Sequence, residues 1–173
     1  EVNQLQIHDL NIITLLKETI GHCFPLQEDN HRIEFHYNHG INSVAADDKC
    51  LRQIFQELLT NAQKFAVPDS PIVVTLEQCE HISMQVKKKI KCTFSNHTVA
   101  VDDKNLQHLF DPFYREQWAI DSAIAGVGLG LTIVRTLIEQ LNGKISVVGK
   151  PSCQPGQSVI TFTLMIPESG ATE

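Results

Sequence analysis

The residues from Asp47 to Phe65 form the clearest amphipathic segment of the chain, and this segment constrains the fold most. Its apolar side chains recur every three or four positions, as they do on an α-helix that buries one face. They are Leu51, Ile54, Phe55, Leu58, Leu59, Ala62 and Phe65. Asp47 or Asp48 can cap this helix at its start, and Pro68 lies just beyond its end. The sequence therefore predicts one long helix whose apolar face packs on the rest of the fold.

The other periodic segments predict a sheet and two more helices. Alternation of apolar and polar residues predicts strands at 33–37, 72–76, 82–94 with a break at Lys88, 145–148 and 159–166. Helical spacing predicts helices at 11–25 and 129–141, the second ended by a left-handed cap at Asn142 and Gly143. The stretch 96–126 has only a short helix signal, which is typical of a lid or binding loop. Together these segments predict an α+β fold, a two-layer sandwich in which about three helices cover one face of a mixed sheet.

Length and charge narrow the classes of function. The 173 residues suit one domain, with a core at about 10–166 and a flexible tail at 169–173. Fourteen basic and twenty acidic residues give a net charge of −6, which argues against binding to nucleic acid or to a membrane surface. The five cysteines are scattered without a C-x-x-C pair, so we expect free thiols in a reducing compartment. Because the chain begins at Glu1 rather than Met, we expect it to be a piece of a larger protein.

A column of polar residues accompanies the apolar face of the long helix. Glu57, Asn61 and Lys64 are spaced i, i+4, i+7, so they project from one side of it. A magnesium ion prefers oxygen ligands, and phosphate oxygens attract a positive charge. The column therefore suits a magnesium–phosphate group. The alternative is an ordinary solvated helix face.

Three glycines at alternate positions, Gly126, Gly128 and Gly130, come directly before the helix at 129–141. Glycine lets the backbone approach a ligand closely, and a helix N-terminus attracts anions. The spacing differs from the dinucleotide fingerprint, and no Gly-Lys-Ser/Thr of a P-loop follows. The glycines indicate either a phosphate-binding loop or a flexible hinge. With the polar column, they favour a nucleoside triphosphate site.

Three segments resemble the signature boxes of sensor histidine kinases. Residues 56–65, QELLTNAQKF, resemble the N box, residues 110–115, FDPFYR, resemble the F box, and residues 126–131, GVGLGL, resemble the G2 box. Their order and spacing also fit, and the resemblance runs from about Leu10 to Ile166. It implies the Bergerat fold, which is shared with gyrase, Hsp90 and MutL ATPases. It also implies an ATP-binding catalytic domain with ATP and Mg²⁺ as cofactors.

The resemblance implies roles for residues of the three boxes. Asn61 would be the magnesium ligand, Lys64 would contact a phosphate, and Phe65 would pack near the nucleotide. Glu57 would help to order the metal and the attacking group, and its sharpest role is general base. Residues 114–125 would form the mobile ATP lid. The expected phosphate-binding residues are Gly126, Gly128, Leu129 and Gly130.

The adenine-reading motif of the family, D-x-G-x-G, departs from its pattern in this chain. Counting back from the F box, it falls on residues 96–100, where Asn96 replaces the Asp and Thr98 and Ala100 replace the glycines. Asn96 can still accept a hydrogen bond from the adenine amino group, but a neutral bond is weaker than a charge-assisted one. We therefore expect a nucleotide site with weakened affinity, or no binding if a new Cβ enters the adenine slot.

A phosphoacceptor motif is also missing. The segment from His8 to Asn11 matches the family's H box only faintly and lacks its proline. The resemblance thus implies a kinase domain that phosphorylates a histidine on a separate dimerisation domain of the same full-length protein, from which a response regulator receiver domain collects the phosphoryl group. Such a domain is cytoplasmic, belongs to a membrane-anchored sensor, and makes no direct membrane contact itself. One alternative is a pseudokinase that serves as a docking module. Another is an ATPase that uses Glu57 to activate water, which the F box and short lid disfavour.

Overall fold

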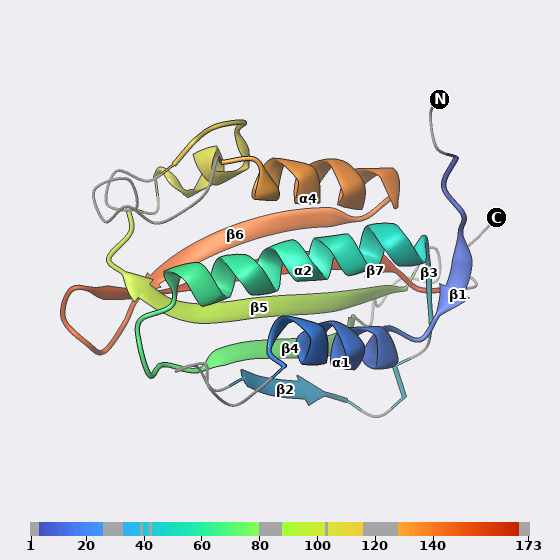
Figure 1. Cartoon of the computed structure of the whole chain (residues 1–173), viewed down its shortest axis with the longest axis horizontal. Helices are drawn as coiled ribbons and strands as arrows, with labels where there is room; N and C mark the ends of the chain where they lie inside the picture. The colour runs from blue at the N-terminus through green and yellow to red at the C-terminus, as the bar shows by residue number, and fades with distance from the viewer. Residues whose placement is uncertain are drawn as a thin grey trace.

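The computed structural model describes residues 4–25, 33–38, 40–41, 43–79, 88–102, 104–115 and 128–169 (Figure 1). Their elements are, in chain order, β1 (His8–Leu10), α1 (Ile12–Cys23), β2 (Ile33–Tyr37), β3 (Val44–Ala46), α2 (Asp48–Phe65), β4 (Ile72–Cys79), β5 (Lys89–Val99), the 3-10 helix η1 (Leu106–Phe110), α4 (Gly130–Gln140), β6 (Lys144–Pro151) and β7 (Gln157–Pro167). The predicted α+β class is confirmed, and so are the three main helices.

Five strands form a mixed sheet in the order β2-β4-β5-β7-β6. The first pair, β2 and β4, is parallel, and the other three pairs are antiparallel. The helices α1, α2 and α4 lie across one face of this sheet, with α2 between the other two (Figure 1). The short strands β1 and β3 pair with each other at the end of the molecule where α2 begins. This is the predicted two-layer arrangement.

Local sequence signals set the ends of the helices. Asp47 caps α2, because its Oδ1 accepts a hydrogen bond from the backbone N–H of Cys50 at 3.1 Å. Its Oδ2 accepts another from the N–H of Gln6 at 2.8 Å, which ties the segment before β1 to the start of α2. After α4, Asn142 adopts the left-handed conformation with φ of 56°, and the N–H of Gly143 donates to the Ile138 carbonyl. The left-handed cap is thus at the asparagine.

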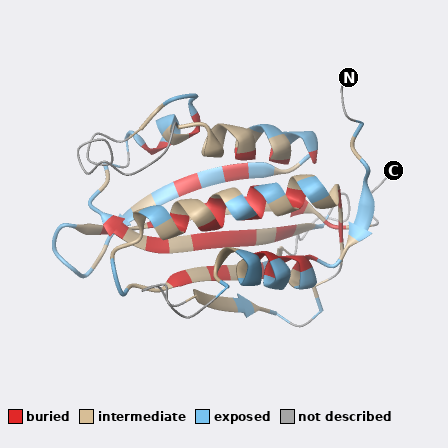
Figure 2. Cartoon of the chain, in the orientation of Figure 1, coloured by how far each residue is buried: buried red, intermediate tan, exposed pale blue. Residues whose placement is uncertain are grey.

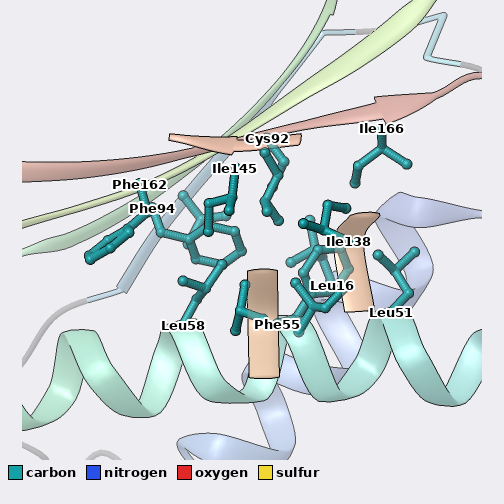
Figure 3. Packing of buried hydrophobic residues seen from close by; sticks show 14 of the residues in the cluster. Leu16, Leu51, Phe55, Leu58, Cys92, Phe94, Ile138, Ile145, Phe162 and Ile166 are labelled. Atoms are coloured by element: carbon teal, nitrogen blue, oxygen red, sulfur yellow. The ribbon is translucent and has the colours of Figure 1, made fainter. Parts of the chain in front are cut away.

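The core lies between the helices and the sheet. Buried residues lie along the central strands and on the helices that cover them (Figure 2). All even-numbered residues of β5 and β7 are buried, and the only buried odd-numbered residue of these two strands is Thr93. Aromatic rings fill the centre: the centroids of Phe55 on α2 and Phe94 on β5 are 5.9 Å apart (Figure 3). Phe110 meets Phe162 edge-on with centroids 6.3 Å apart. This packing holds α2 and η1 on the sheet, and residues of both elements line the candidate site.

The main correction concerns the end of β5. The sequence predicts a loop from residue 96, but the strand continues to Val99. The reason is tertiary: β7 pairs with β5 along its whole length, as far as Val99 opposite Gln157. Backbone pairing of this kind does not need apolar side chains. Asn96 and Thr98 are therefore strand residues.

Smaller differences concern short or partly described elements. Strands β1 and β3, of three residues each, were not predicted, and His8 of the faint H-box match lies in β1. Strand β4 extends to Cys79, three residues beyond the predicted end. The part of the predicted 82–94 strand before Lys88 lies outside the described residues, as do residues 170–173 of the predicted tail.

Candidate functional site

A cavity of about 450 Å³ opens between the second half of α2, the end of β5, η1 and the start of α4. Most of the predicted site residues line it: Glu57, Asn61, Lys64, Phe65, Asn96, Thr98, Gly128, Leu129 and Gly130. Ala100 is exposed and is not among the lining residues, and its N–H donates to the Gly156 carbonyl at 2.9 Å. Gly126 lies outside the described residues. The fold thus brings the N-box and G2-box segments to one cavity.

The polar column of α2 forms one wall of the cavity. Glu57, Asn61 and Lys64 all face it, as their helical spacing predicts. Glu57 and Asn61 are half-buried, and Lys64 is exposed. The wall therefore presents a carboxylate and an amide group near the core and an ammonium group toward solvent. Of the two alternatives for the column, a magnesium–phosphate site and a solvated helix face, its position in a cavity wall favours the first.

The start of α4 forms the opposite wall. A side chain on Gly130 would begin 2.7 Å from Oε2 of Glu57, so the carboxylate reaches across the cavity to the first residue of α4. Leu129 precedes the helix and makes no side-chain hydrogen bond to it. The Leu129 side chain therefore does not cap the first N–H groups of α4. These N–H groups give the helix N-terminus a partial positive charge. The wall is suited to an anion.

Gly128 joins the start of α4 to the F-box segment through the backbone. Its φ is +75°, and a Cβ at this position would lie 2.7 Å from the Tyr114 carbonyl oxygen and 2.8 Å from the Phe113 carbonyl carbon. The N–H of Phe113 donates to the Gly128 carbonyl at 2.9 Å. Only glycine allows both the left-handed conformation and this close approach. The contact joins the two segments on either side of residues 116–127. Residues 116–127 themselves, which make up most of the predicted lid, lie outside the described residues.

Two buried polar residues of β5 form the floor of the cavity. Asn96 is 3% exposed and Thr98 is 2% exposed. The Asn96 side-chain amide donates through Nδ2 to the His97 carbonyl at 3.1 Å. The Thr98 hydroxyl is buried and has no hydrogen-bond partner in the described part of the chain. A buried hydroxyl is normally paired, so this one is available to a ligand.

Apolar residues complete the cavity, and the sequence pattern assigns only Leu131, in the G2-box segment, to the site. They are Val101, Leu106, Leu109, Leu131, Ile133, Ile160 and Phe162. Val101 lies in a predicted loop, and the others have the spacing of core positions in a helix or strand. Tyr114 and Arg115, the last described residues before 116, also line the cavity. An apolar slot with a few polar groups on its floor and walls suits a flat heteroaromatic ring carrying a charged tail.

The residues fit a magnesium ion that is bound together with phosphates. The described residues contain no group of three or more His, Cys, Asp or Glu side chains placed to hold a metal ion by themselves. Glu57 and Asn61 offer oxygen donors from one wall, and hard cations prefer oxygen. Magnesium commonly takes one or two protein ligands and completes its shell with substrate phosphates and water. The donor set matches that mode of binding.

None of the helices in the described ranges combines the length and the apolar character that crossing a bilayer requires.

The chain resembles known proteins in sequence and in fold. Residues 46–169 match the family described as histidine kinase-, DNA gyrase B-, and HSP90-like ATPase. The chain is 25% identical over 165 residues to the sensor protein VanSC of Enterococcus gallinarum, an alignment that covers 95% of this chain and 42% of that protein. It is 38% identical over 104 residues to the sensor histidine kinase YvrG of Bacillus subtilis, covering 60% of this chain and 16% of that protein. It therefore spans less than half the length of these relatives.

A solved structure supports the same fold. Full-length ShkA in complex with AMPPNP superposes with a TM-score of 0.74 at 20% identity, covering 99% of this chain and 34% of that one. The match extends over the sheet and the helices that enclose the cavity. The family match covers most of the chain and includes all the described cavity residues. The chain belongs to the histidine kinase-, DNA gyrase B-, and HSP90-like ATPase family.

Proposed function

We propose that the cavity binds Mg-ATP and that the domain transfers its γ-phosphoryl group to a histidine on a separate dimerisation domain of the full-length protein. One observation carries the proposal: the polar column of α2 faces the uncapped glycine start of α4 across a single cavity. The complex of ShkA with AMPPNP supports it, because that protein of the same fold binds a nucleotide analogue.

Each wall has a role in this proposal. The N–H groups at the start of α4, with those of Gly128 and Gly130, bind phosphate oxygens, and Lys64 adds a positive charge at the solvent side. The amide oxygen of Asn61 holds Mg²⁺, which would neutralise charge on the phosphates during transfer. Phe65 and the apolar residues enclose the base. We assign no role to Ala100, since it is not among the lining residues.

We assign Glu57 the role of general base toward the acceptor histidine. In the transfer, the bond between the γ-phosphorus and the bridging oxygen breaks and a phosphorus–nitrogen bond forms. The histidine ring loses a proton, and the Glu57 carboxylate accepts it as general base. ADP leaves with the bridging oxygen. Most of the rate enhancement then comes from positioning and charge neutralisation, as in other phosphoryl transfers.

The partners and the location follow from this activity and are also proposals. The phosphoacceptor histidine is on the dimerisation domain, and a response regulator receiver domain takes the phosphoryl group from it. We propose that the domain works in the cytoplasm, where ATP and free thiols are found, as the ATP-binding core at 10–166 of a longer sensor.

Calorimetry with Mg-ADP and Mg-ATP tests the proposal. We expect binding in the micromolar to millimolar range, and we expect Asn61→Ala to abolish the dependence on magnesium. The single tryptophan, Trp118, is in the predicted lid segment and outside the described residues, and its fluorescence gives a second readout. No binding at several millimolar nucleotide by either method would overturn the proposal.

A pseudokinase is the second candidate. The replacement of the family's Asp and glycines by Asn96, Thr98 and Ala100 favours it. Phosphotransfer to a supplied dimerisation domain separates the two. Binding of ADP without transfer indicates a docking module, and transfer indicates a kinase.

A further inference from the structure

The orientation of the Asn96 amide on the cavity floor is fixed by its neighbours. The His97 carbonyl accepts hydrogen bonds from Asn96 Nδ2 at 3.1 Å and from the Val67 N–H, just beyond α2, at 2.8 Å. A carbonyl oxygen can only accept, so the nitrogen of the Asn96 amide must be the atom that faces it. The amide oxygen is left as the group that can accept a hydrogen bond from a ligand.

Thr98 lies beside Asn96 on the same face of β5, two residues further on, or about 6.6 Å along the strand. Its hydroxyl is buried without a partner among the described residues. Ser158 pairs with Thr98 across the sheet, and its Oγ accepts a hydrogen bond from the Val101 N–H at 3.3 Å, not from Thr98. The cavity floor therefore presents a fixed acceptor and, next to it, an unused hydroxyl.

We propose that Thr98 contributes to adenine binding by donating its hydroxyl hydrogen to N1 of the base, while the amide oxygen of Asn96 accepts from the adjacent 6-amino group. The inference rests on the proposed function, since it requires a nucleotide in this cavity. The 6-amino group and N1 lie at the end of adenine farthest from the ribose, so they are the atoms that reach the floor when the phosphates lie at α4. The threonine, although it replaces a glycine of the family motif, thereby adds a contact.

The Asn96 amide disfavours guanine and hypoxanthine. Both bases carry an oxygen at position 6, which would face the amide oxygen of Asn96. Both atoms are hydrogen-bond acceptors, so no hydrogen bond can form between them. Asn96 cannot turn to offer its nitrogen without giving up the bond to the His97 carbonyl. Both bases also carry a hydrogen on N1, from which the rotatable Thr98 hydroxyl can accept, so the discrimination comes from the Asn96 amide. ATP is therefore expected to bind better than GTP or ITP.

The test compares Thr98→Val, which keeps the branched shape, with Thr98→Ser, which keeps the hydroxyl. Binding of Mg-ADP to the 173-residue chain is measured by calorimetry. We expect Thr98→Val to weaken it about three- to tenfold, the range for one buried neutral hydrogen bond, and Thr98→Ser to weaken it less. With 1-deaza-ADP, which lacks N1, wild type and Thr98→Val should bind alike. With 7-deaza-ADP the penalty of Thr98→Val should remain.

The thermal midpoint of the free chain gives an independent readout. If the hydroxyl serves only the ligand, Thr98→Val keeps or raises this midpoint, since it removes a buried group without a partner. A lowered midpoint would indicate a structural role and overturn the inference. So would equal penalties of Thr98→Val with ADP and 1-deaza-ADP, or no penalty with ADP. No binding of ADP by the wild type would instead overturn the proposed function.

Discussion

The carboxylate of Glu57 occupies the space in which a side chain on Gly130 would begin: the distance from Oε2 to that position is 2.7 Å. This relationship brings α2 and α4 together at the cavity, with an acidic group from one helix at the start of the other. It also separates the roles of two neighbouring glycines, since the obstacle at Gly130 is a movable side chain and the obstacle at Gly128 is backbone.

Gly128→Ala is expected to destabilise the domain much more than Gly130→Ala. An alanine at 128 would have to adopt a left-handed conformation, at a cost of about 1–2 kcal/mol, and would also overlap the backbone of Phe113 and Tyr114. An alanine at 130 meets only the end of the flexible Glu57 side chain, which can move. Urea unfolding of both variants measures the difference. Equal destabilisation would contradict this account of the two glycines.

Glu57→Gln is expected to slow phosphotransfer about 100-fold or more while Mg-ADP still binds, because a general base contributes about 10²–10⁴ in rate. The measurement is the initial rate of phosphorylation of a supplied dimerisation domain, alongside calorimetry with Mg-ADP. Glu77→Gln is the matched control. Glu77 is on β4, away from the cavity, and pairs only with the surface residue Lys91 among the described residues. A rate for Glu57→Gln that equals that of the control would exclude Glu57 as the base.

Two phenylalanines of the F-box segment are expected to differ strongly in their effect on stability. Phe110 is 2% exposed and packs against Phe162, so Phe110→Ala should lower the free energy of unfolding by about 3–5 kcal/mol. Phe113 is 72% exposed, so Phe113→Ala should change it by about 0.5 kcal/mol or less. Chemical denaturation of the two variants is the measurement. A large loss for Phe113→Ala would mean that its side chain stabilises the fold through contacts beyond the described residues.

The stability that Asp47 contributes is expected to depend on pH. Hydrogen bonds from the backbone N–H groups of Gln6 and Cys50 hold the pKa of this carboxyl below its usual value. Because the pKa is lower in the folded state, the contribution is fully present above the unfolded pKa, near 3.9, and is lost as the pH falls through the folded pKa.

Asp47→Ala should therefore lower the free energy of unfolding by about 0.5–2 kcal/mol at pH 7, as expected for loss of a helix N-cap. The difference in free energy of unfolding between wild type and Asp47→Ala should become smaller below about pH 4, as the pH approaches the folded pKa of Asp47. Asp47→Asn keeps an acceptor for the N–H of Cys50. It should therefore lose less stability at pH 7 than Asp47→Ala, and its free energy of unfolding should depend less on pH than that of wild type. Urea unfolding from pH 2.5 to 7 follows all three proteins. A difference in free energy of unfolding between wild type and Asp47→Ala that stays constant over this range would rule out the Asp47 carboxylate as the cause of that difference.

The helices and the α2 wall of the site could be predicted from sequence because their signals are local. A period of 3.6 residues places Glu57 and Asn61 on the same side of α2 whatever surrounds the helix. The end of β5 could not be predicted in the same way. Asn96 and Thr98 are polar and interrupt the apolar alternation, and they are strand residues because β7 pairs with both and β4 also pairs with Asn96.

The finer geometry of the cavity depends on contacts between distant segments. The orientation of the Asn96 amide requires the His97 carbonyl, and the burial of the Thr98 hydroxyl without a partner among the described residues depends on the packing around β5. The sequence marks residues 96–100 as a departure from the family motif, which suggests only a loss of affinity. The structure shows that two of the replacing residues are buried on the cavity floor.

The backbone contact between Phe113 and Gly128 has a consequence for how this domain can vary among related chains. Because the N–H of Phe113 binds the Gly128 carbonyl, these two backbone positions, fifteen residues apart in the sequence, are held together. The free energy of closing a loop rises only by about 0.6 kcal/mol for each doubling of its length. A change in the number of residues between the two positions is therefore expected to alter the stability of the sheet and helices little. Because the contact is made by backbone atoms, related chains can differ in the length of this segment and still keep the contact at its two ends.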